Sequence, residues 1–333
     1  MTATIRDVAK KAGVSCSTVS RALMGNVPVK ENTKRRIFEA VKEVNYRPVQ
    51  SARALKMGRT KTLQLILPNN LNPFYPKLLN CLNNEIKKYG YATFLSVSND
   101  SKEEEKMSFQ MARSFSVDGI IYLPTTDDCN HMGELVSANI PTVIINRVWD
   151  LGFPCVSIDN QSGAYRTVEY LIQNGHRRIA CFLGDISLQH MREREAGCRK
   201  AFRDYGIREG EARFLYGTQT YEVYEKMCSL MKEKKEKRIT GCFASSDWMA
   251  VGMYSAIMKS GLSIPGDISV VGFDDIEDAR FMIPPLTTWH HPVEQIAKVA
   301  VDLLIRQIEK GEDTKEKIII PSKIVERESV RRI

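Results

Sequence analysis

Short apolar runs alternate with amphipathic stretches throughout residues 62–333, and this alternation limits the possible folds more than any other feature of the chain. Continuous apolar runs of strand length are typical of parallel sheets, whose strands are buried on both faces. The stretches between them carry apolar residues at the spacing of helices that pack on such a sheet. The pattern therefore predicts an α/β architecture with helices between parallel strands.

The predicted elements form two successive groups of the same plan. The first group has strands near 63–67, 92–97, 119–123 and 142–145, and helices near 75–89, 102–114 and 131–138. The second group has strands near 178–183, 213–216, 240–244 and 268–272, and helices near 161–174, 191–205, 220–234 and 247–259. We expect two lobes whose strands point their carboxyl ends at a shared cleft, which is where open α/β sheets bind ligands.

The first residues follow a different pattern, typical of two short helices joined by a tight turn. We expect Thr4 to cap a first helix that ends at Gly13, and Ser15 to cap a second helix. The apolar faces consist of Ile5, Val8, Ala9 and Ala12 in the first helix and of Val19, Ala22 and Leu23 in the second. This arrangement predicts an all-α helix-turn-helix.

A third helix and a basic linker follow. The helix, capped around Asn32 or Thr33, should run to Tyr46, because Pro48 cannot continue it. Residues 49–61 permit a helix in their middle but contain almost no core-forming side chains. We expect that this linker cannot fold alone.

The charge of the chain is concentrated at this end. Residues 1–61 contain fourteen lysines and arginines against four acidic residues, a net charge of +10, whereas the whole chain carries +8. The remaining residues therefore carry a net charge of −2. A basic segment around a helix-turn-helix indicates binding to the phosphate backbone of double-stranded DNA.

The second helix can enter the major groove with its polar face toward the bases. Arg21 can donate two hydrogen bonds to a guanine, worth about 1–3 kcal/mol of discrimination. Cys16 and Ser17 would contact base edges closely or only weakly. Hydroxyl groups suit phosphate oxygens, and the candidates for these contacts are Thr4, Ser15, Thr18, Ser20, Thr33 and Tyr46.

Four segments together resemble the LacI/GalR family of bacterial regulators, and the resemblance extends along nearly the whole chain. They read Thr-Ile-Arg-Asp-Val-Ala-Lys-Lys-Ala-Gly-Val-Ser (4–15), Ser-Thr-Val-Ser-Arg-Ala-Leu (17–23), Asn-Tyr-Arg-Pro (45–48) and Ala-Arg-Ala-Leu-Lys (52–56). The resemblance implies a hinge helix in the linker and a minor-groove wedge at Leu55, which could also pack on its dimer mate. Met24 departs from the family pattern, which commonly has asparagine there.

The resemblance also implies an effector domain similar to a periplasmic sugar-binding protein, in which the chain crosses between lobes three times. Candidate crossings lie near 157–162, 286–292 and 318–324. The expected domains are 1–48 for DNA binding, 49–61 for the hinge and 62–333 for effector binding and dimerisation. The last divides into an N-lobe of about 62–158 plus 292–318 and a C-lobe of about 162–288 plus 322–333.

Candidate effector-binding residues follow from strand ends and from the resemblance. Asp274, at the end of Val-Val-Gly-Phe-Asp-Asp (270–275), resembles the carboxylate with which the family accepts sugar hydroxyls, and Arg194 matches its Arg-x-x-Gly segment. Phe74 could stack on a ligand or pack in the core. The other candidates are Arg147, Ser246, Tyr221 and His291; we expect Asp247, beside Ser246, to cap the next helix.

A pocket of arginines, a carboxylate and aromatic rings suits a sugar or sugar derivative, and two cations against one anion make a phosphorylated or acidic sugar possible. We expect the effector to shift the DNA-binding equilibrium by its different affinity for two lobe arrangements. Induction and corepression both fit. One helix-turn-helix reads only a half-site, so a homodimer on a palindromic operator is expected, most simply as a repressor.

Several other classes of protein are disfavoured. No apolar stretch is long enough to span a membrane, and no export signal precedes the basic segment, which argues against a transport receptor and for a cytoplasmic protein. Eight scattered cysteines without a Cys-x-x-Cys pair read as free thiols. Without a nucleophile elbow or a phosphate-binding loop we expect no enzyme, no cofactor and no metal, although a sugar-active enzyme is the remaining competitor.

Overall fold

The computed structural model describes residues 3–24, 29–46, 58–69, 72–133, 137, 139–208 and 210–333. The chain divides into two compact units, Met1–Thr60 and Lys61–Ile333. In the described part of the first unit the helices are α1 (Ile5–Ala12), α2 (Cys16–Met24) and α3 (Glu31–Glu43). They share a small core made of Val8, Ala9, Ala12, Val19, Ala22, Ile37 and Ala40.

The turn between α1 and α2 is built as the sequence predicts. The Asp7 carboxylate accepts hydrogen bonds from the backbone N–H and the hydroxyl of Thr4, each at 2.8 Å, and these bonds lower the pKa of Asp7. Gly13 ends α1 with a φ of +63°, a conformation that costs glycine little. The Ser15 hydroxyl then caps α2 by accepting from the Thr18 N–H at 3.2 Å.

Both predicted ends of the third helix are wrong. Helix α3 begins at Glu31 and its N-cap is Lys30, whereas a cap at Asn32 or Thr33 would start the helix two or three residues later. It ends at Glu43, because Asn45 has a φ of +50° and the Tyr46 N–H returns to the Val41 carbonyl at 3.0 Å. The predicted hinge helix and Leu55 lie outside the described residues.

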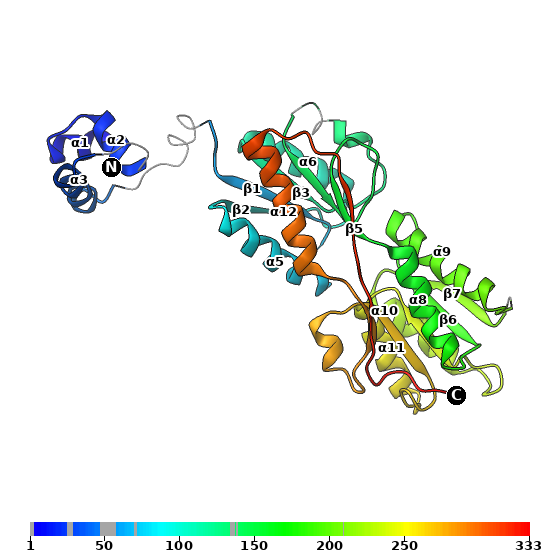
Figure 1. Ribbon diagram of the computed structural model, residues 1–333. Coiled ribbons are helices and arrows are strands. Elements are labelled where there is room, and N and C mark those ends of the chain that lie inside the picture. The colour runs from blue at the N-terminus through cyan, green and yellow to red at the C-terminus, as the bar shows by residue number, and fades with distance from the viewer. Residues whose placement is uncertain are drawn as a thin grey trace. The chain divides into compact units, whose positions relative to one another are not determined.

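Two six-stranded sheets form the second unit, one in each lobe (Figure 1). In the N-lobe the strand order is β11 (Lys317–Ile320), β5 (Cys155–Ile158), β4 (Thr142–Ile145), β3 (Gly119–Tyr122), β1 (Thr62–Leu67) and β2 (Ala92–Val97). In the C-lobe it is β12 (Ile324–Val325), β10 (Thr287–His290), β9 (Ser269–Asp274), β8 (Gly241–Ala244), β6 (Ile179–Leu183) and β7 (Ala212–Tyr216). Within the described ranges, β10 and β12 alone pair antiparallel.

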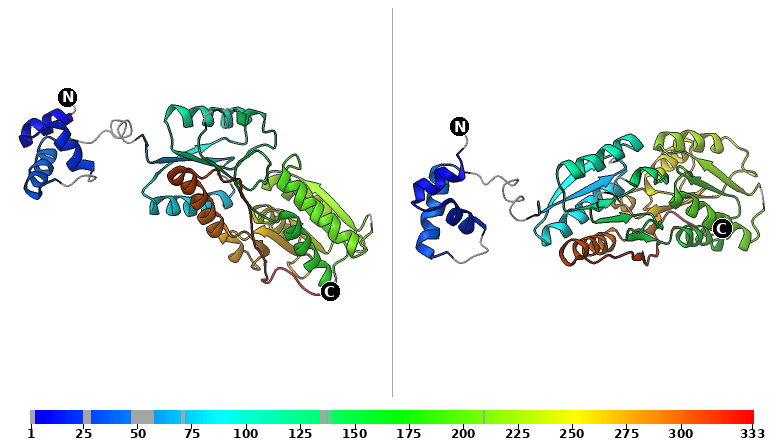
Figure 2. Two further views of the ribbon diagram at one scale, coloured as in Figure 1. Left: turned by 45° about the horizontal axis from the view of Figure 1, so that its top comes forward. Right: turned by 90° about the horizontal axis from the view of Figure 1, so that it is seen from above.

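Helices cover the sheets on both sides, as Figure 2 shows. The N-lobe helices are α5 (Phe74–Lys88), α6 (Lys102–Ser114) and α12 (Val293–Lys310), and the C-lobe helices are α8 (Asn160–Gln173), α9 (Gln189–Asp204), α10 (Thr220–Met231) and α11 (Asp247–Lys259). Two short 3-10 helices are Asn130–Met132 and Glu277–Arg280. The predicted helix at 131–138 falls partly outside the described residues. The α/β fold class with two parallel-sheet lobes is confirmed.

The chain passes between the lobes three times: between β5 and α8, between β10 and α12, and between β11 and β12. Helix α12 belongs to the N-lobe although it follows ten strands, because it packs beside α5 and on β3 and β4 (Figure 1). The sequence pattern did not identify this helix or the strands next to the crossings. No helix in the described part of the chain is both long and apolar enough to cross a bilayer.

Helices α8 and α9 lie unusually close together in the C-lobe. A Cβ on Gly197 would lie 2.2 Å from the backbone oxygen of Gln161 and 2.9 Å from the backbone nitrogen of Tyr165. Only glycine fits this contact without moving the helices apart. The close packing fixes the start of α9, from which side chains reach the cleft.

Candidate ligand-binding cleft and DNA-binding face

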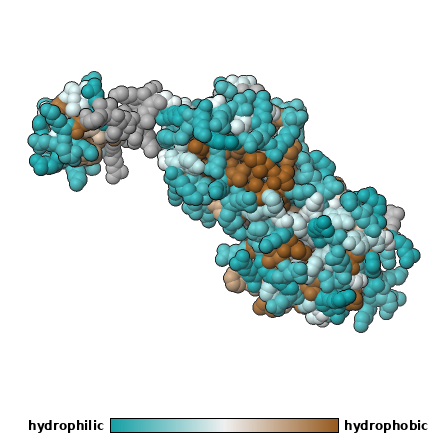
Figure 3. Space-filling model, viewed as in Figure 1, coloured by the Kyte–Doolittle hydropathy of each residue, from teal (hydrophilic) through white to brown (hydrophobic). Residues whose placement is uncertain are grey.

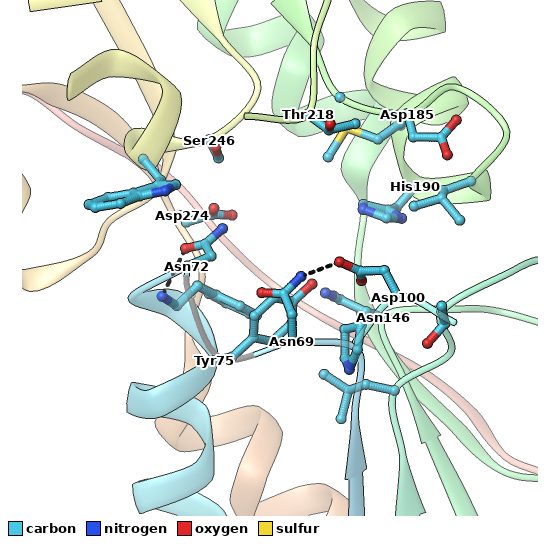
Figure 4. Close-up of a pocket in the computed structure, with 18 of the residues that line it drawn as sticks. Asn69, Asn72, Tyr75, Asp100, Asn146, Asp185, His190, Thr218, Ser246 and Asp274 are labelled. Atoms are coloured by element: carbon cyan, nitrogen blue, oxygen red, sulfur yellow. Dashed lines mark hydrogen bonds between the residues drawn. The ribbon is translucent and has the colours of Figure 1, made fainter. Parts of the chain in front are cut away.

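A cleft of about 420 Å³ lies between the two lobes. Its polar lining comes from residues that directly follow strands in both sheets, such as Asn146 after β4 and Ser246 after β8 (Figure 4). The two walls thus bring together side chains that are far apart in the chain. A cleft of this size and position is typical of small-molecule sites.

Arg194, on the first turns of α9, is the most constrained charged group of the cleft. Its side chain is 3% exposed. Its Nε donates to Asn160 Oδ1 at 3.0 Å, another nitrogen donates to the Ser245 carbonyl, and the third lies 3.6 Å from Asp274 Oδ1. The guanidinium also stacks 3.7 Å above the Phe273 ring. Burial lowers the pKa of Arg194, an effect that Asp274 opposes.

Asp274 and Asp275 are adjacent in the chain, but their carboxylates lie in different surroundings and have different partners. Asp274 lines the cleft at the end of β9 with a φ of +113°, a conformation that non-glycine residues adopt at a cost. Asp275 bonds instead to His290 and Arg327. Although burial acts in the opposite direction, these two bonds lower the pKa of Asp275 to about 2. The two carboxylates therefore do not form an acid-base pair.

The expectation that Asp247 caps α11 is wrong. The cap is Ser246, whose hydroxyl accepts from the Met249 N–H at 3.3 Å. Asp247 is fully buried and accepts from Thr288 Oγ1 at 2.6 Å and from the Ile276 N–H at 2.9 Å. Burial raises its pKa well above the ordinary range. Ser246 nevertheless lines the cleft, as its place after β8 suggested.

Arg147 lines the N-lobe wall and is 3% exposed. Its Nε donates to Asp127 at 2.9 Å, and its terminal nitrogens donate to the carbonyls of Asn146 and Pro124. The second oxygen of Asp127 accepts from Arg192 at 2.8 Å. Because Arg192 belongs to α9 of the C-lobe, Asp127 connects the two lobes at the edge of the cleft.

Phe74 packs in the core and also borders the cleft, and its stacking on a ligand stays a prediction. It is 5% exposed and belongs to the apolar core, yet it also lines the cleft. Its ring lies 4.6 Å from that of His291. His291 is completely buried behind it, 3.6 Å from Asp274, and does not itself appear in the lining.

Tyr221 is the one candidate that the structure separates from the others. Its side chain is 67% exposed and stacks on Tyr224 at 6.0 Å, on the outer surface of α10. Thr218 and Gln219, just before this helix, line the cleft in its place. We therefore remove Tyr221 from the candidate site.

Several lining residues escaped the sequence analysis although they share one signal, a position shortly after a strand. They are Asn69, Asp100, Thr125, Asn146, Asp185 and Thr218. His190, on α9, was also missed. It is 9% exposed, and its buried Nδ1 has no hydrogen-bond partner. An isolated polar residue of this kind has no local pattern that distinguishes it from a surface residue.

We expect the effector unit to lose stability on acidification because His190 and His291 are buried. Burial, and then the nearby arginines Arg147 and Arg194, lower the pKa of His190 well below its ordinary value; burial also lowers that of His291, against the attraction of Asp274. The unfolded chain therefore binds more protons below about pH 6.5, and each histidine should remove up to about 1.4 kcal/mol of stability per pH unit.

Urea unfolding between pH 7 and 5 measures this slope. The His190→Gln/His291→Gln variant should have a shallower slope than the wild-type protein. An unchanged slope in the double variant would contradict the assignment.

The DNA-binding unit presents the expected polar face. Cys16, Ser17 and Arg21 are exposed on α2, while Val19 and Ala22 on the same helix are buried. Among the phosphate candidates, Thr4 and Ser15 are exposed and Thr18, Ser20, Thr33 and Tyr46 are partly buried. The Ser15 hydroxyl already bonds to Thr18 and Ser17. One of these contacts engages Ser17, itself a candidate for base reading, and the DNA contacts of α2 stay a prediction.

A basic helix-turn-helix unit joined to a two-lobed α/β unit with a polar cleft defines a class, the ligand-responsive DNA-binding regulators. Comparison with known proteins agrees. Residues 4–49 match the profile of bacterial regulatory proteins of the lacI family, and residues 168–330 match the periplasmic binding protein-like domain. The chain belongs to the lacI family of bacterial transcriptional regulators.

Relatives and solved structures cover the chain almost completely. It is 32% identical over 338 residues to the transcriptional repressor PurR of Aliivibrio fischeri, with 98% of each protein covered. It is 33% identical to the regulator RegA of Clostridium saccharobutylicum, with 99% of each covered. The Lac repressor dimer bound to operator and the anti-inducer ONPF superposes with a TM-score of 0.89 at 25% identity, over 99% of this chain and all of that one. These homologues are transcriptional regulators, not enzymes.

Proposed function

We propose that this protein is a repressor that binds a palindromic operator as a homodimer and responds to a sugar or sugar derivative in the interlobe cleft. The observation that carries the proposal is the cleft itself, which has walls from both lobes. A ligand touching both walls stabilises one lobe arrangement over the other and so shifts the DNA-binding equilibrium. We place the protein in the cytoplasm, where its DNA target lies.

The polar atoms of the cleft support a hydroxylated ligand. Ser246 can donate, Asp274 can accept, and Asn146 Oδ1 and His190 Nδ1 are buried without partners. Phe74 offers an apolar surface beside them. Sugars combine hydroxyl groups with an apolar ring face, which matches this set. Among the structural relatives, the regulator CelR was solved with cellobiose, at 28% identity and a TM-score of 0.72.

Calorimetry of the purified protein against a panel of monosaccharides and disaccharides tests the effector class. We expect at least one sugar to bind and to change operator affinity by about 5–150-fold, the usual range of coupling between two sites. Binding of a purine or an amino acid, with no response to any sugar, would exclude the sugar hypothesis.

Exposed apolar side chains on both lobes support a homodimer. The N-lobe exposes Leu95, Met107, Met111 and Phe115, and the C-lobe exposes Met258, Phe281 and Ile283. Figure 3 shows that the face it draws is mostly hydrophilic, with apolar areas on both lobes. Such areas are typical of interfaces between subunits. Analytical ultracentrifugation of the full chain at micromolar concentration should show a dimer; a monomer on DNA and off it would refute this part.

Two substitutions should separate base reading from backbone binding. Arg21→Ala should weaken operator binding about 5–150-fold, the loss of one bidentate contact to a base, and should affect non-specific DNA less. Leu55→Ala, outside the described residues, should likewise weaken specific more than non-specific binding if it is a minor-groove wedge. Fluorescence anisotropy on operator and scrambled duplexes, over a range of salt, measures both. Equal losses on the two duplexes would contradict these roles.

A further inference from the structure

We propose that the effector carries no phosphate or carboxylate group, so that the cleft selects an uncharged ligand. This inference rests on the proposed function and narrows its ligand class. The two arginines allowed a phosphorylated or acidic sugar when the sequence was considered alone. Their contacts in the folded protein show that neither is available to neutralise an anion.

Each guanidinium nitrogen of both arginines already has a protein partner. Arg147 donates to Asp127 and to two backbone carbonyls. Arg194 donates to Asn160 and to the Ser245 carbonyl and faces Asp274. Their terminal N–H groups retain a donor each for a neutral oxygen, because a guanidinium has five donors. Each positive charge also faces a carboxylate of the protein: Asp274 lies 3.6 Å from Arg194, and Asp127 pairs with Arg147 and with Arg192.

Helix N-termini are the other common anion sites, and side chains occupy them in three of the helices that begin at the cleft; α9 differs, because its N-cap Leu188 makes no side-chain hydrogen bond. Asn72 Oδ1 accepts from the Phe74 N–H at 3.0 Å at the start of α5, and Ser246 caps α11. Before α10, the Glu222 carboxylate accepts from the Thr218 N–H at 2.9 Å. At α5, α10 and α11, side-chain oxygens therefore take backbone donors that a phosphate would need.

Two further carboxylates make the cleft unfavourable for anions. Asp100 follows β2 in the N-lobe and Asp185 follows β6 in the C-lobe; both are exposed and both line the cleft. Asp100 accepts from Asn69 at 2.8 Å and Asp185 from the Ser187 N–H at 2.8 Å, and neither forms an ion pair with a described cation. His190 lies between them in the view of Figure 4.

The lining thus contains three carboxylates, Asp100, Asp185 and Asp274, against two arginines. His190 adds no positive charge at neutral pH, since burial lowers its pKa. A phosphate or carboxylate entering the cleft would be repelled by the negative charges of Asp100 and Asp185, which form no ion pair with a described cation. A hydroxyl group would meet unpaired neutral donors and acceptors.

Matched ligand pairs test this charge selection in the intact protein by calorimetry: ribose with ribose 5-phosphate, glucose with glucose 6-phosphate, and adenosine with adenosine 5′-monophosphate. In whichever pair binds, we expect the neutral member to bind at least ten-fold more tightly. A phosphate that binds as well as its neutral counterpart, or better, overturns the inference. If adenosine alone binds, the sugar proposal fails and the charge inference is judged on the adenosine pair. If no member of any pair binds, the result contradicts both the sugar proposal and the charge inference.

Variants of Asp100 and Asp185, which we call the rim carboxylates, identify the cause of the preference for a neutral ligand. Asp100→Asn/Asp185→Asn should reduce the preference for the neutral member at least three-fold. Asp150→Asn/Asp313→Asn removes the same charge from carboxylates that are 98% and 82% exposed outside the cleft, and should leave the preference unchanged. An unaltered preference in the rim variant, or an equal change in both variants, overturns the assignment to Asp100 and Asp185.

Discussion

Arg194→Ala is expected to abolish the response of the protein to its effector, with a loss of at least about 100-fold in effector affinity. Removing one partner of a buried ion pair typically costs about 3–5 kcal/mol, because the remaining charge stays buried and unpaired. Here the remaining charge is Asp274, which is 7% exposed. The substitution also removes the donor that joins α9 to Asn160 of α8.

Calorimetry with the effector and urea unfolding measure the two consequences separately. The Arg194→Ala/Asp274→Asn variant removes both charges, so it should recover part of the stability but none of the binding. Arg203→Ala, on the same helix with a side chain 73% exposed, should change neither. Wild-type effector affinity in Arg194→Ala would remove this residue from the site.

Gly197→Ala should destabilise the effector unit by about 3 kcal/mol, at the upper end of the usual cost of overpacking. The added methyl group would lie 2.2 Å from a backbone oxygen, so a flexible side chain cannot simply move aside, and α8 and α9 must separate. A domain of this size should then melt at a temperature roughly 6–12 °C lower. Because Arg194 is one turn before Gly197, effector affinity should also fall.

Thermal unfolding followed by circular dichroism checks this prediction. Gly133→Ala is a suitable control, since a Cβ there would meet nothing within 4 Å and its φ is −54°. The control should be neutral or slightly stabilising. A melting temperature equal to wild type in Gly197→Ala would show that the two helices can part without cost.

Local patterns were sufficient to predict most of the fold. Apolar runs located β1 and β4 within a residue or two, because strands of a parallel sheet are buried on both faces. They did not separate β11 from the connecting chain, since that strand is defined by its pairing of Lys317 with Cys155, far away in the sequence. Long-range pairing of this kind leaves little trace in a local pattern.

The candidate site was predictable to a similar degree. Arg194 and Asp274 lie 80 residues apart in the chain, and the resemblance to the family placed both in one candidate site; their mutual contact was not predicted. The prediction that Tyr221 lines the cleft was wrong because the way a helix packs on its sheet decides which of its first side chains point into the cleft. The burial of His190 likewise depends on both lobes at once.

Asp127 has a consequence for how easily the lobes can part. When the lobes separate, the Arg192 side chain, which is already 53% exposed, becomes fully hydrated, and Asp127 keeps its bond to Arg147. Neither charge is left buried without a partner, so separating this pair, in which Arg192 is 53% and Asp127 17% exposed, costs only about 1 kcal/mol. The ion pair between the lobes is therefore weak. A metabolite present at ordinary cellular concentration can shift the equilibrium between the two lobe arrangements.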